Sequence, residues 1–589
     1  MKRYIAILIM LCAMPFVASA EVTKQVEVTK KYTPEIGEAR KLDVAPNMVD
    51  TITIRPEIDY TITPRSFASA LGTHRFNPAS VTYWEHKHKS PFYLKLGAGY
   101  PLNSVGDLYA SAHRPGVGYL TGYANHYGQY SKLKYRNGID GKLYNDNRSM
   151  QMHNKFGVMG GKYFGRYTLA GDLFYRMEQY HRYPFRNEYA ADVTPILVYK
   201  RRKIDFDDVN LALSFGDSFT DYSHLNFKVY ASADWYNDKS EIFIDGDSYS
   251  QMDVKAGAAI ARSITKKSSF SLDVNYEGYY GLKSLKEYSN SILGADLRYV
   301  YRSGALVDLT VGAKLLYDQN PADTQKQNRW HGFPYLAVSL NINDKGAFVP
   351  YVEVDGQLQN NSYYSLLRRN PYIAILGGAN GSLSTDSVVP NTELYNVRFG
   401  VSGHSASSKF AYRFYANMSF MRNAVYWYNI NQIFFGLESA SRNIWSLCGA
   451  IDYKPISQLL ITASVKGSLY TNFANVHDAM PNVEALLRAR YTHDKFTVGL
   501  SAELIGPTKW TCVQDYTLFQ PTTTLQTQRG EFKAPTSLDL SLYGDYHATK
   551  KCTVYGEVNN ILGDVMPTYR WAFYREMGAS FTVGVKVQF

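Results

Sequence analysis

From residue 92 onward, apolar and polar residues alternate along the chain in stretches of roughly 9–14 residues. One such stretch places Phe496, Val498, Leu500, Ala502 and Leu504 between Thr497, Gly499, Ser501 and Glu503. Successive side chains of a β-strand point to opposite faces of the sheet. Each stretch therefore predicts a strand with one apolar face and one face that contacts water.

The lengths of these stretches, and of the connections between them, favour a membrane barrel over a soluble β-sandwich. A tilted strand needs about 9–11 residues to span a bilayer, whereas strands of soluble proteins usually have about 5–6. Short turns, such as 265–268 and 547–550, alternate with long loops, as they do in outer-membrane barrels. The predicted long loops are residues 132–151, 179–205, 360–389, 421–441 and 507–535.

Pairing these stretches as ascending and descending strands gives about 22 strands, from 92–100 to 578–589. The predicted fold class is all-β: a transmembrane antiparallel β-barrel of residues 92–589. A short Pro-containing arm, residues 21–91, precedes the barrel and is expected either in the periplasm or inserted into the lumen. No run of about 20 apolar residues follows the N-terminus, so no membrane-spanning helix is predicted.

The first 20 residues have the pattern of a secretory signal peptide. Lys2 and Arg3 precede an apolar stretch, and Ala18-Ser19-Ala20 forms the small-residue cleavage site. We therefore expect cleavage near Ala20 and localisation in the outer membrane of a Gram-negative cell.

Composition agrees with this interpretation. The chain holds 50 Tyr, and barrels use such amphipathic rings in girdles at both membrane interfaces. The net charge of +11 is dispersed rather than clustered, so no nucleic-acid partner is predicted. Apart from one cysteine in the signal peptide, Cys448, Cys512 and Cys552 are too few and too scattered for a disulfide framework.

Charged residues recur at the polar positions of the predicted strands. In hydrocarbon a charge is costly, so we expect these side chains to face a wet lumen or one another, either in a solute path or as ordinary lumen solvation. The candidates are Lys95, Lys228, Asp234, Asp308, Lys314, Glu353, Asp355, Lys466, Asp539 and Glu557.

Motifs for catalysis or cofactor binding are absent from the sequence. We find no Gly-x-Ser-x-Gly and no His-Glu-x-x-His, so no enzyme and no cofactor are predicted. Glu85, His86 and His88 lack a further ligand for Zn²⁺. Asp245, Asp247 and Asp253 around a predicted external loop suit a hydrated acidic turn better than a Ca²⁺ site. No metal site is therefore predicted.

The last forty or so residues carry a more specific pattern. The strand 554–562 passes through Asn559-Asn560-Ile561-Leu562, and Tyr569 follows in a loop before a closing strand that ends at Phe589. This pattern resembles the C-terminal end of TonB-dependent receptors, whose barrels have 22 strands. A terminal aromatic residue on such an alternating strand also resembles the signal that the outer-membrane assembly machinery reads, so Phe589 is the expected assembly signal.

One departure from that family bears on function. The family carries a plug domain of well over a hundred residues inside the barrel, whereas only about 70 residues, 21–91, precede the first predicted strand here. A globular plug does not fit into this length, so we expect a barrel that resembles the family but lacks its plug domain. Wide barrels normally have a filled lumen, so the arm, the long loops or a partner protein is expected to occlude it.

Three functional hypotheses follow. The leading one is a passive or partner-gated, porin-like conduit for solutes. The second is a scaffold that docks other envelope proteins, and the third is energised TonB-dependent uptake in which a partner supplies the plug. Expected partners are outer-membrane lipid and lipopolysaccharide, the barrel-assembly machinery during insertion, and an envelope protein.

Overall fold

The computed structural model describes residues 91–589 except 137–142, 182–202, 241–248, 304–305, 321–328, 343–346, 374–388, 406, 408, 431–433, 473, 475 and 515–527. The predicted signal peptide and nearly all of the arm lie outside the described residues, as do Glu85, His86, His88, Asp245 and Asp247. The corresponding expectations stay predictions. In the part of the chain that is described, no helix is long and apolar enough to cross a membrane.

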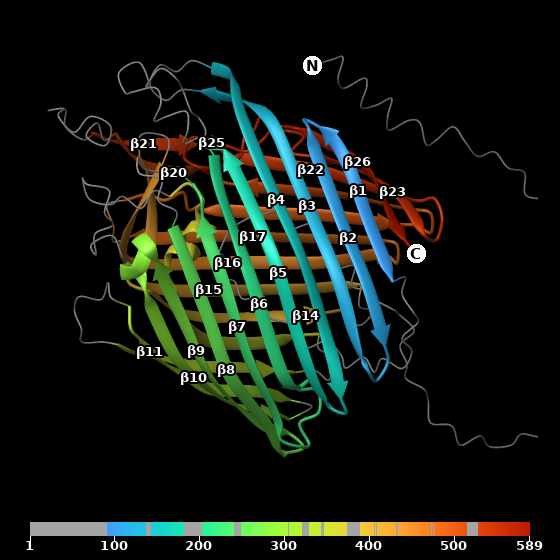
Figure 1. Ribbon diagram of the computed structural model, residues 1–589, viewed down its shortest axis with the longest axis vertical. Coiled ribbons are helices and arrows are strands. Elements are labelled where there is room, and N and C mark those ends of the chain that lie inside the picture. The colour runs from blue at the N-terminus through green and yellow to red at the C-terminus, as the bar shows by residue number, and fades with distance from the viewer. Residues whose placement is uncertain are drawn as a thin grey trace, which may run out of the picture. The chain divides into compact units, whose positions relative to one another are not determined.

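A closed antiparallel barrel of 22 strands confirms the predicted fold class. Its strands are β1 (Phe92–Tyr100), β2 (Asn103–Arg114), β3 (Gly118–Arg136), β4 (Leu143–Phe164), β5 (Tyr167–His181), β6 (Lys203–Asp217), β7 (Asn226–Asp238), β8 (Tyr249–Thr265), β9 (Ser268–Leu282), β10 (Asn290–Arg302), β11 (Val307–Asp318), β12 (Trp330–Leu340), β13 (Val349–Gln359), β14 (Thr392–His404), β15 (Phe410–Ile430), β16 (Phe434–Ile456), β17 (Leu459–Asn472), β18 (Val483–Thr492), β19 (Phe496–Ile505), β22 (Ser537–His547), β23 (Cys552–Asn559) and β26 (Ser580–Gln588). Figure 1 shows the early strands on the near wall and the later ones crossing behind them.

The first and last strands close the ring. β1 and β26 are antiparallel, and Leu96 lies opposite Val585. The backbone N–H of Phe92 donates to the carbonyl of Phe589 at 3.0 Å, and Phe589 donates back to Phe92 at 3.1 Å. Because a closed ring leaves no strand edge, this pairing satisfies backbone groups that lipid cannot solvate.

The outer face of the wall is apolar, as the alternation predicts. Val229, Leu447 and Leu469 have 52%, 71% and 70% of their surface exposed, respectively. Their neighbours along each strand point to the other face. A surface this apolar is stable against lipid rather than water, which is the arrangement expected of a transmembrane barrel.

The two ends of the barrel differ. At one, the turn end, connections are short: only Gly165 and Arg166 join β4 to β5, and Gly165 has a φ of +63°, which suits glycine. At the other, the loop end, connections carry further elements. These are the 3₁₀ helix η3 (Lys283–Tyr288), helix α3 (Tyr363–Arg369) and the strands β20 (Thr508–Gln514), β21 (Gln528–Ala534), β24 (Tyr569–Trp571) and β25 (Tyr574–Arg575).

Several predicted loops are corrected by these elements. The loop predicted at 421–441 is mostly strand, because β15 and β16 extend beyond the apolar wall around a bulge between Met421 and Ala424. The predicted loops at 360–389 and 507–535 contain α3 and the β20–β21 hairpin. Asp253 lies on β8, where it accepts a hydrogen bond from Gln251 Nε2 at 2.5 Å.

Three cysteines lie within the described residues. Cys448, Cys512 and Cys552 are all free thiols.

Candidate functional site at the loop end

A buried cluster of aromatic and aliphatic side chains fills the loop end of the barrel. It joins the ends of β6, β7, β8, β15 and β16 with η3, α3, β20 and the short β24–β25 hairpin. Barrel walls usually present water-facing residues on the inside, so a packed apolar core here is unusual. We call this set of residues the mouth cluster; it consists of Ile204, Phe206, Tyr236, Tyr249, Leu285, Tyr288, Tyr363, Tyr364, Leu366, Leu367, Ile373, Val389, Val425, Trp427, Phe435, Trp510, Trp571, Ala572, Phe573 and Tyr574. It joins elements from distant parts of the ring, as expected of a structure that crosses the mouth.

Helix α3 supplies much of the mouth cluster. Ser362 caps its N-terminus by accepting a hydrogen bond from the Ser365 N–H, and Asn370 ends it by donating its backbone N–H to Leu366. Arg368 and Arg369 occupy the last turn, where positive charge complements the helix dipole. A helix of one or two turns is marginal in water. Its stability therefore comes from packing, and its buried residues are Tyr363, Tyr364, Leu366 and Leu367.

Polar contacts hold α3 against the inner wall formed by β7 and β8. The Tyr363 hydroxyl donates to Asp238 Oδ2 at 2.6 Å. The backbone N–H of Tyr364 donates to Gln251 Oε1 at 3.1 Å, and Gln251 Nε2 donates to Ser362 Oγ at 3.0 Å. Both Asp238 and Gln251 are almost fully buried. Buried polar groups need such partners because unmade bonds are costly, so these contacts fix the position of α3.

A second network ties α3 to β5 and β6. Arg176 donates two hydrogen bonds to the Asp208 carboxylate, at 2.7 and 2.5 Å, and one to the Tyr364 hydroxyl at 2.6 Å. Arg368 donates to the same hydroxyl at 3.0 Å and lies 3.9 Å from the Glu178 carboxylate. Burial raises the pKa of Tyr364 well above its usual value. The phenol therefore stays neutral at physiological pH.

The C-terminal loop contacts the cluster from another side. Trp571 meets Trp427 edge-on with 6.1 Å between ring centroids, and it also lies within 5.5 Å of Trp510 and 5.3 Å of Phe435. Tyr574 lies over Tyr372, which follows α3, at 3.9 Å. Such pairs contribute about 0.5–1.5 kcal/mol each beyond their burial. The last long loop is thus packed against the α3 segment.

A buried ion pair lies close to the mouth cluster. Arg442 on β16 donates to Asp478, in the connection after β17, at 2.7 Å, and both side chains are 5% exposed. The Arg442 guanidinium also lies 3.8 Å from the Tyr426 ring centroid. A buried charge without its partner is strongly destabilising. This pair therefore fixes the loop between β17 and β18 against the long strands.

The charged residues predicted from the alternation lie elsewhere, along the wall. They are on the face opposite exposed apolar residues of the same strands, such as Val229, Leu315 and Val465. Lys95 lies 3.6 Å from Glu557, Lys466 donates to Glu484 at 2.7 Å, and Glu353 accepts from Arg398 at 2.7 Å. Asp539 accepts from Ser541 at 2.9 Å. Lys228, Asp234, Asp308, Lys314 and Asp355 lie on three different strands, and the ten residues do not form one site.

Sequence reasoning missed the residues of α3 and Trp571. A signal for α3 was present: Ser362 is a good N-cap, and apolar residues follow at 363, 364, 366 and 367, which is helical spacing. For Trp571, a tryptophan in a loop gives no such signal. Across the described residues, no group of three or more His, Cys, Asp and Glu is placed to hold a metal ion.

Comparison with known proteins gives a likeness in structure but not in sequence. No family model and no curated protein matches the chain. The siderophore receptor PirA from Acinetobacter baumannii aligns with a TM-score of 0.63 at 10% identity, over 86% of this chain and 81% of that one. The copper transporter OprC aligns with a TM-score of 0.56 at 14% identity, over 86% and 81%.

A third structure gives the same result. The ferripyoverdine receptor of the outer membrane of Pseudomonas aeruginosa aligns with a TM-score of 0.58 at 12% identity, over 86% of this chain and 72% of that one. Identities this low establish the fold alone. The resemblance expected from the C-terminal pattern is thus confirmed for the barrel: the chain has the 22-strand fold of TonB-dependent receptors.

Proposed function

We propose that this protein is an outer-membrane, transporter-like barrel without a plug domain, acting as a conduit that its own mouth cluster closes at the loop end. The loop end faces the exterior of the cell, and the signal peptide is removed near Ala20. The observation that carries the proposal is the attachment of α3 to the inner wall by Tyr363–Asp238 and by Tyr364–Arg176.

The nature of this attachment supports a gate rather than a fixed wall. Backbone ladders hold the wall strands together over eleven or more residue pairs in seams such as β10–β11 and β13–β14. Helix α3 is held instead by apolar packing of Leu366 and Leu367, by ring contacts and by hydrogen bonds that each involve a side chain. Each such hydrogen bond contributes about 0.5–1.5 kcal/mol, or 1.5–3 kcal/mol to a charged partner. Helix α3 can therefore leave the wall without breaking the barrel.

The comparisons support transport over catalysis. The solved structures with this fold include a siderophore receptor, a ferripyoverdine receptor and a copper transporter. The charged residues of the inner wall, among them Lys95, Asp308 and Lys314, would line the solute path.

Ion conductance in planar bilayers tests the proposal. In the Tyr363→Phe/Tyr364→Phe variant, α3 loses the hydroxyls that bind Asp238, Arg176 and Arg368. A loss of about 3 kcal/mol would raise the open population about 100-fold. Tyr412→Phe is the matched control, because its hydroxyl donates to Ala347 at the turn end. Equal conductance of wild type and both variants would overturn the proposal.

The other two hypotheses predict different results with the same proteins. A scaffold would show no ion conductance in any variant and would co-purify with envelope proteins. Energised uptake would lose solute import in a cell that lacks TonB, whereas a passive conduit would retain it. Deletion of residues 21–91 separates occlusion by the arm from occlusion by α3. If the arm occludes the lumen, the deletion raises conductance; if α3 occludes it, the deletion leaves conductance unchanged.

A further inference from the structure

The seam between β12 and β13 is an exception in the barrel wall. These two strands, both described in full, are paired only over 336–339 and 351–354. Their other neighbours are paired over eleven positions, β12 with β11 and β13 with β14. In lipid, every unpaired backbone group carries a large cost. A seam paired over only four positions is therefore the weakest place in the wall.

On the loop-end half of the seam, contacts between side chains take the place of backbone pairing between β12 and β13. Phe333 of β12 lies over Gly356 of β13, so closely that a Cβ on Gly356 would be 2.4 Å from the Phe333 ring. Phe333 also meets the ring of Tyr395 on β14, with 4.9 Å between centroids, and the Tyr395 hydroxyl is 3.5 Å from the Gly332 carbonyl. Glycine is required at 356 because any side chain would displace Phe333.

These contacts show that the wall overlaps itself here. Phe333 alternates with the exposed Gly332 and Pro334, so it points inward. Tyr395 shares its strand face with Phe399, which is 45% exposed and points outward. An inward side chain of β12 therefore contacts an outward side chain of β14. The tops of β13 and β14 lie behind β12, on its lumenal side.

Charged groups complete the overlap. His331 Nδ1 of β12 lies 3.2 Å from the Glu393 carboxylate of β14, and its Nε2 lies 3.9 Å from Asp318 of β11. Glu393 in turn lies 3.7 Å from Arg422 of β15, whose side chain is 70% exposed. Side-chain contacts of this kind can separate and re-form while the ladders on either side remain intact.

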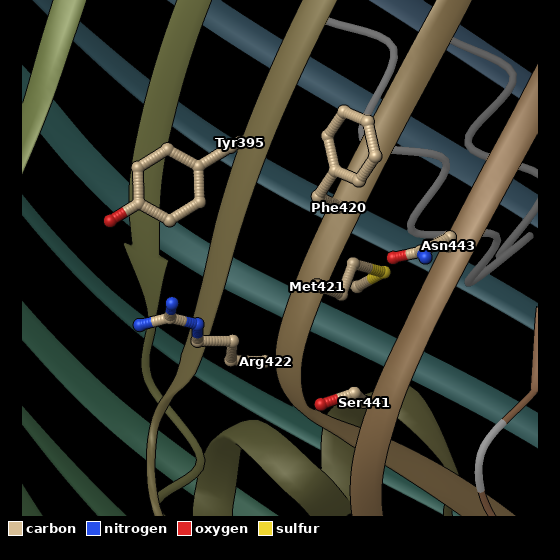
Figure 2. A pocket seen from close by; sticks show the side chains of 6 residues that line it. All are labelled: Tyr395, Phe420, Met421, Arg422, Ser441 and Asn443. Carbon is tan, nitrogen blue, oxygen red and sulfur yellow. The ribbon is translucent and has the colours of Figure 1, made fainter.

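A pocket opens on the outer wall beside the overlap. It has a volume of about 560 Å³, within the usual range for ligand pockets. Tyr395, Phe420 and Met421 supply its apolar side, whereas Arg422, Ser441 and Asn443 supply polar groups (Figure 2). Phe420 packs edge-on against Trp445, which is 45% exposed on the apolar outer wall. The pocket is thus continuous with the lipid-facing surface and shares Tyr395 with the seam.

We propose that the β12–β13 seam is a lateral gate through which a single-chain amphiphile with an anionic head group passes between the lumen and the surrounding membrane leaflet. The aromatic side of the pocket fits the alkyl chain, and exposed Arg422 complements the anionic head. Glu393 is mostly buried and already paired with His331, which leaves Arg422 as the dominant exposed charge. The inference rests on the proposed function in one respect, namely that the lumen serves as a path.

A disulfide across the overlap tests this gate. In a background in which Cys448, Cys512 and Cys552 are serine, the variant Phe333→Cys/Gly356→Cys brings together two Cβ positions 3.0 Å apart. A separation of about 0.5 Å brings them into the range of about 3.5–4.5 Å found in disulfides. The matched control is Leu315→Cys/Gly332→Cys in the adjacent seam, where the two residues lie directly opposite each other. Reduction of either disulfide restores the starting state in the same sample.

The probe is palmitic acid that carries a diazirine, added to proteoliposomes and irradiated, with labelled residues mapped by mass spectrometry. We expect labelling of inward residues Tyr335 and Tyr351 in the reduced protein and at least a tenfold loss after oxidation. Labelling of Phe420 and Trp445 on the outer wall should remain. The control disulfide should leave both sets unchanged. Inward labelling that is absent when reduced, or unchanged when oxidised, would overturn the lateral gate.

Two single variants keep the test decisive if the double variant does not fold. Gly356→Ala displaces Phe333 and should raise inward labelling at least twofold, whereas Gly467→Ala, with nothing within 4 Å of the added Cβ, should not. Arg422→Glu should lower labelling of Phe420. Ion conductance of the same samples tests the conduit separately. A barrel that conducts no ions, but whose inward labelling is lost when the disulfide forms, would contradict the conduit and support the lateral gate.

Discussion

Trp571, in the last loop of the chain, meets Trp427 of β15 edge-on, with 6.1 Å between the two ring centroids. Both rings are buried. Because Trp571 also contacts Phe435 and Trp510, one side chain links three strands to the loop between β23 and β26. This indole therefore ties the last loop to three strands of the loop end.

Replacing Trp571 by alanine should loosen the mouth cluster without opening the barrel wall. Truncation of a buried Trp costs about 3–5 kcal/mol, and the cost falls on loop contacts. We expect protease cleavage within 560–579 to accelerate at least tenfold, while the heat-modifiable mobility of the folded barrel on gels is retained. Trp445→Ala on the outer wall, where Trp445 is 45% exposed, is the control and should leave the cleavage rate unchanged.

The buried pair of Arg442 and Asp478 predicts a strong effect of neutralising one partner. Asp478→Asn leaves the guanidinium buried with its main anion gone, at a cost of about 3–5 kcal/mol. Unfolding in urea should detect this as a lower midpoint. In a double-mutant cycle, Arg442→Met should recover much of the loss. The pair of Lys466 and Glu484, at 24% and 28% exposure, should show far weaker coupling, and equal coupling energies would contradict the assignment.

Charge placed on the outer wall should be penalised, whereas charge on the inner wall should be tolerated. Val229→Lys puts an ammonium group on the exposed apolar face and should lower the free energy of unfolding in lipid by about 2–4 kcal/mol. Ser232→Lys, on the opposite face of the same strand β7, should change it by less than about 1 kcal/mol. Similar losses of unfolding free energy for both variants would mean that one face does not contact lipid and the other water.

If Phe589 is an assembly signal, its substitution should affect assembly in cells but not folding in vitro. Its ring stacks on Phe92 at 5.3 Å and is 54% exposed, so its packing contributes little. If the assembly machinery reads this residue, Phe589→Ala should reduce the folded barrel in cells severalfold but leave refolding into detergent unchanged. Phe92→Ala removes the same stacking pair and should reduce neither. Equal behaviour of the two variants would exclude a recognition role.

The sequence predicted the wall well because lipid imposes a simple rule on it. Each residue of β1 or β26 faces either lipid or the interior, and the alternation records that choice. The strand predicted at 92–100 has the same bounds as β1, and the predicted strand at 578–589 contains β26. The ten predicted charged residues alternate with apolar residues on their strands, although no single site unites them, and their role in a lumen stays a prediction.

The loop end escaped prediction because lipid does not order it. Beyond Phe420, β15 leaves the apolar wall, and the bulge with Asn423 at a φ of +54° interrupts the alternation. Helix α3 and the Trp571 contacts depend on tertiary packing between segments far apart in sequence. The overlap at Phe333 and Tyr395 was equally hidden, because alternation shows which face a residue takes but not how many pairs two strands form.

The most direct test of the closed mouth is the single-channel conductance of a variant in which the seven residues Tyr363–Arg369 are replaced by a Gly/Ser linker. The variant keeps every wall strand and removes only the helix that binds Asp238, Arg176 and Gln251. We predict stable ion conductance at least tenfold above that of the wild-type protein in the same bilayer. Identical conductance of the two proteins would contradict the claim that the mouth cluster closes the lumen.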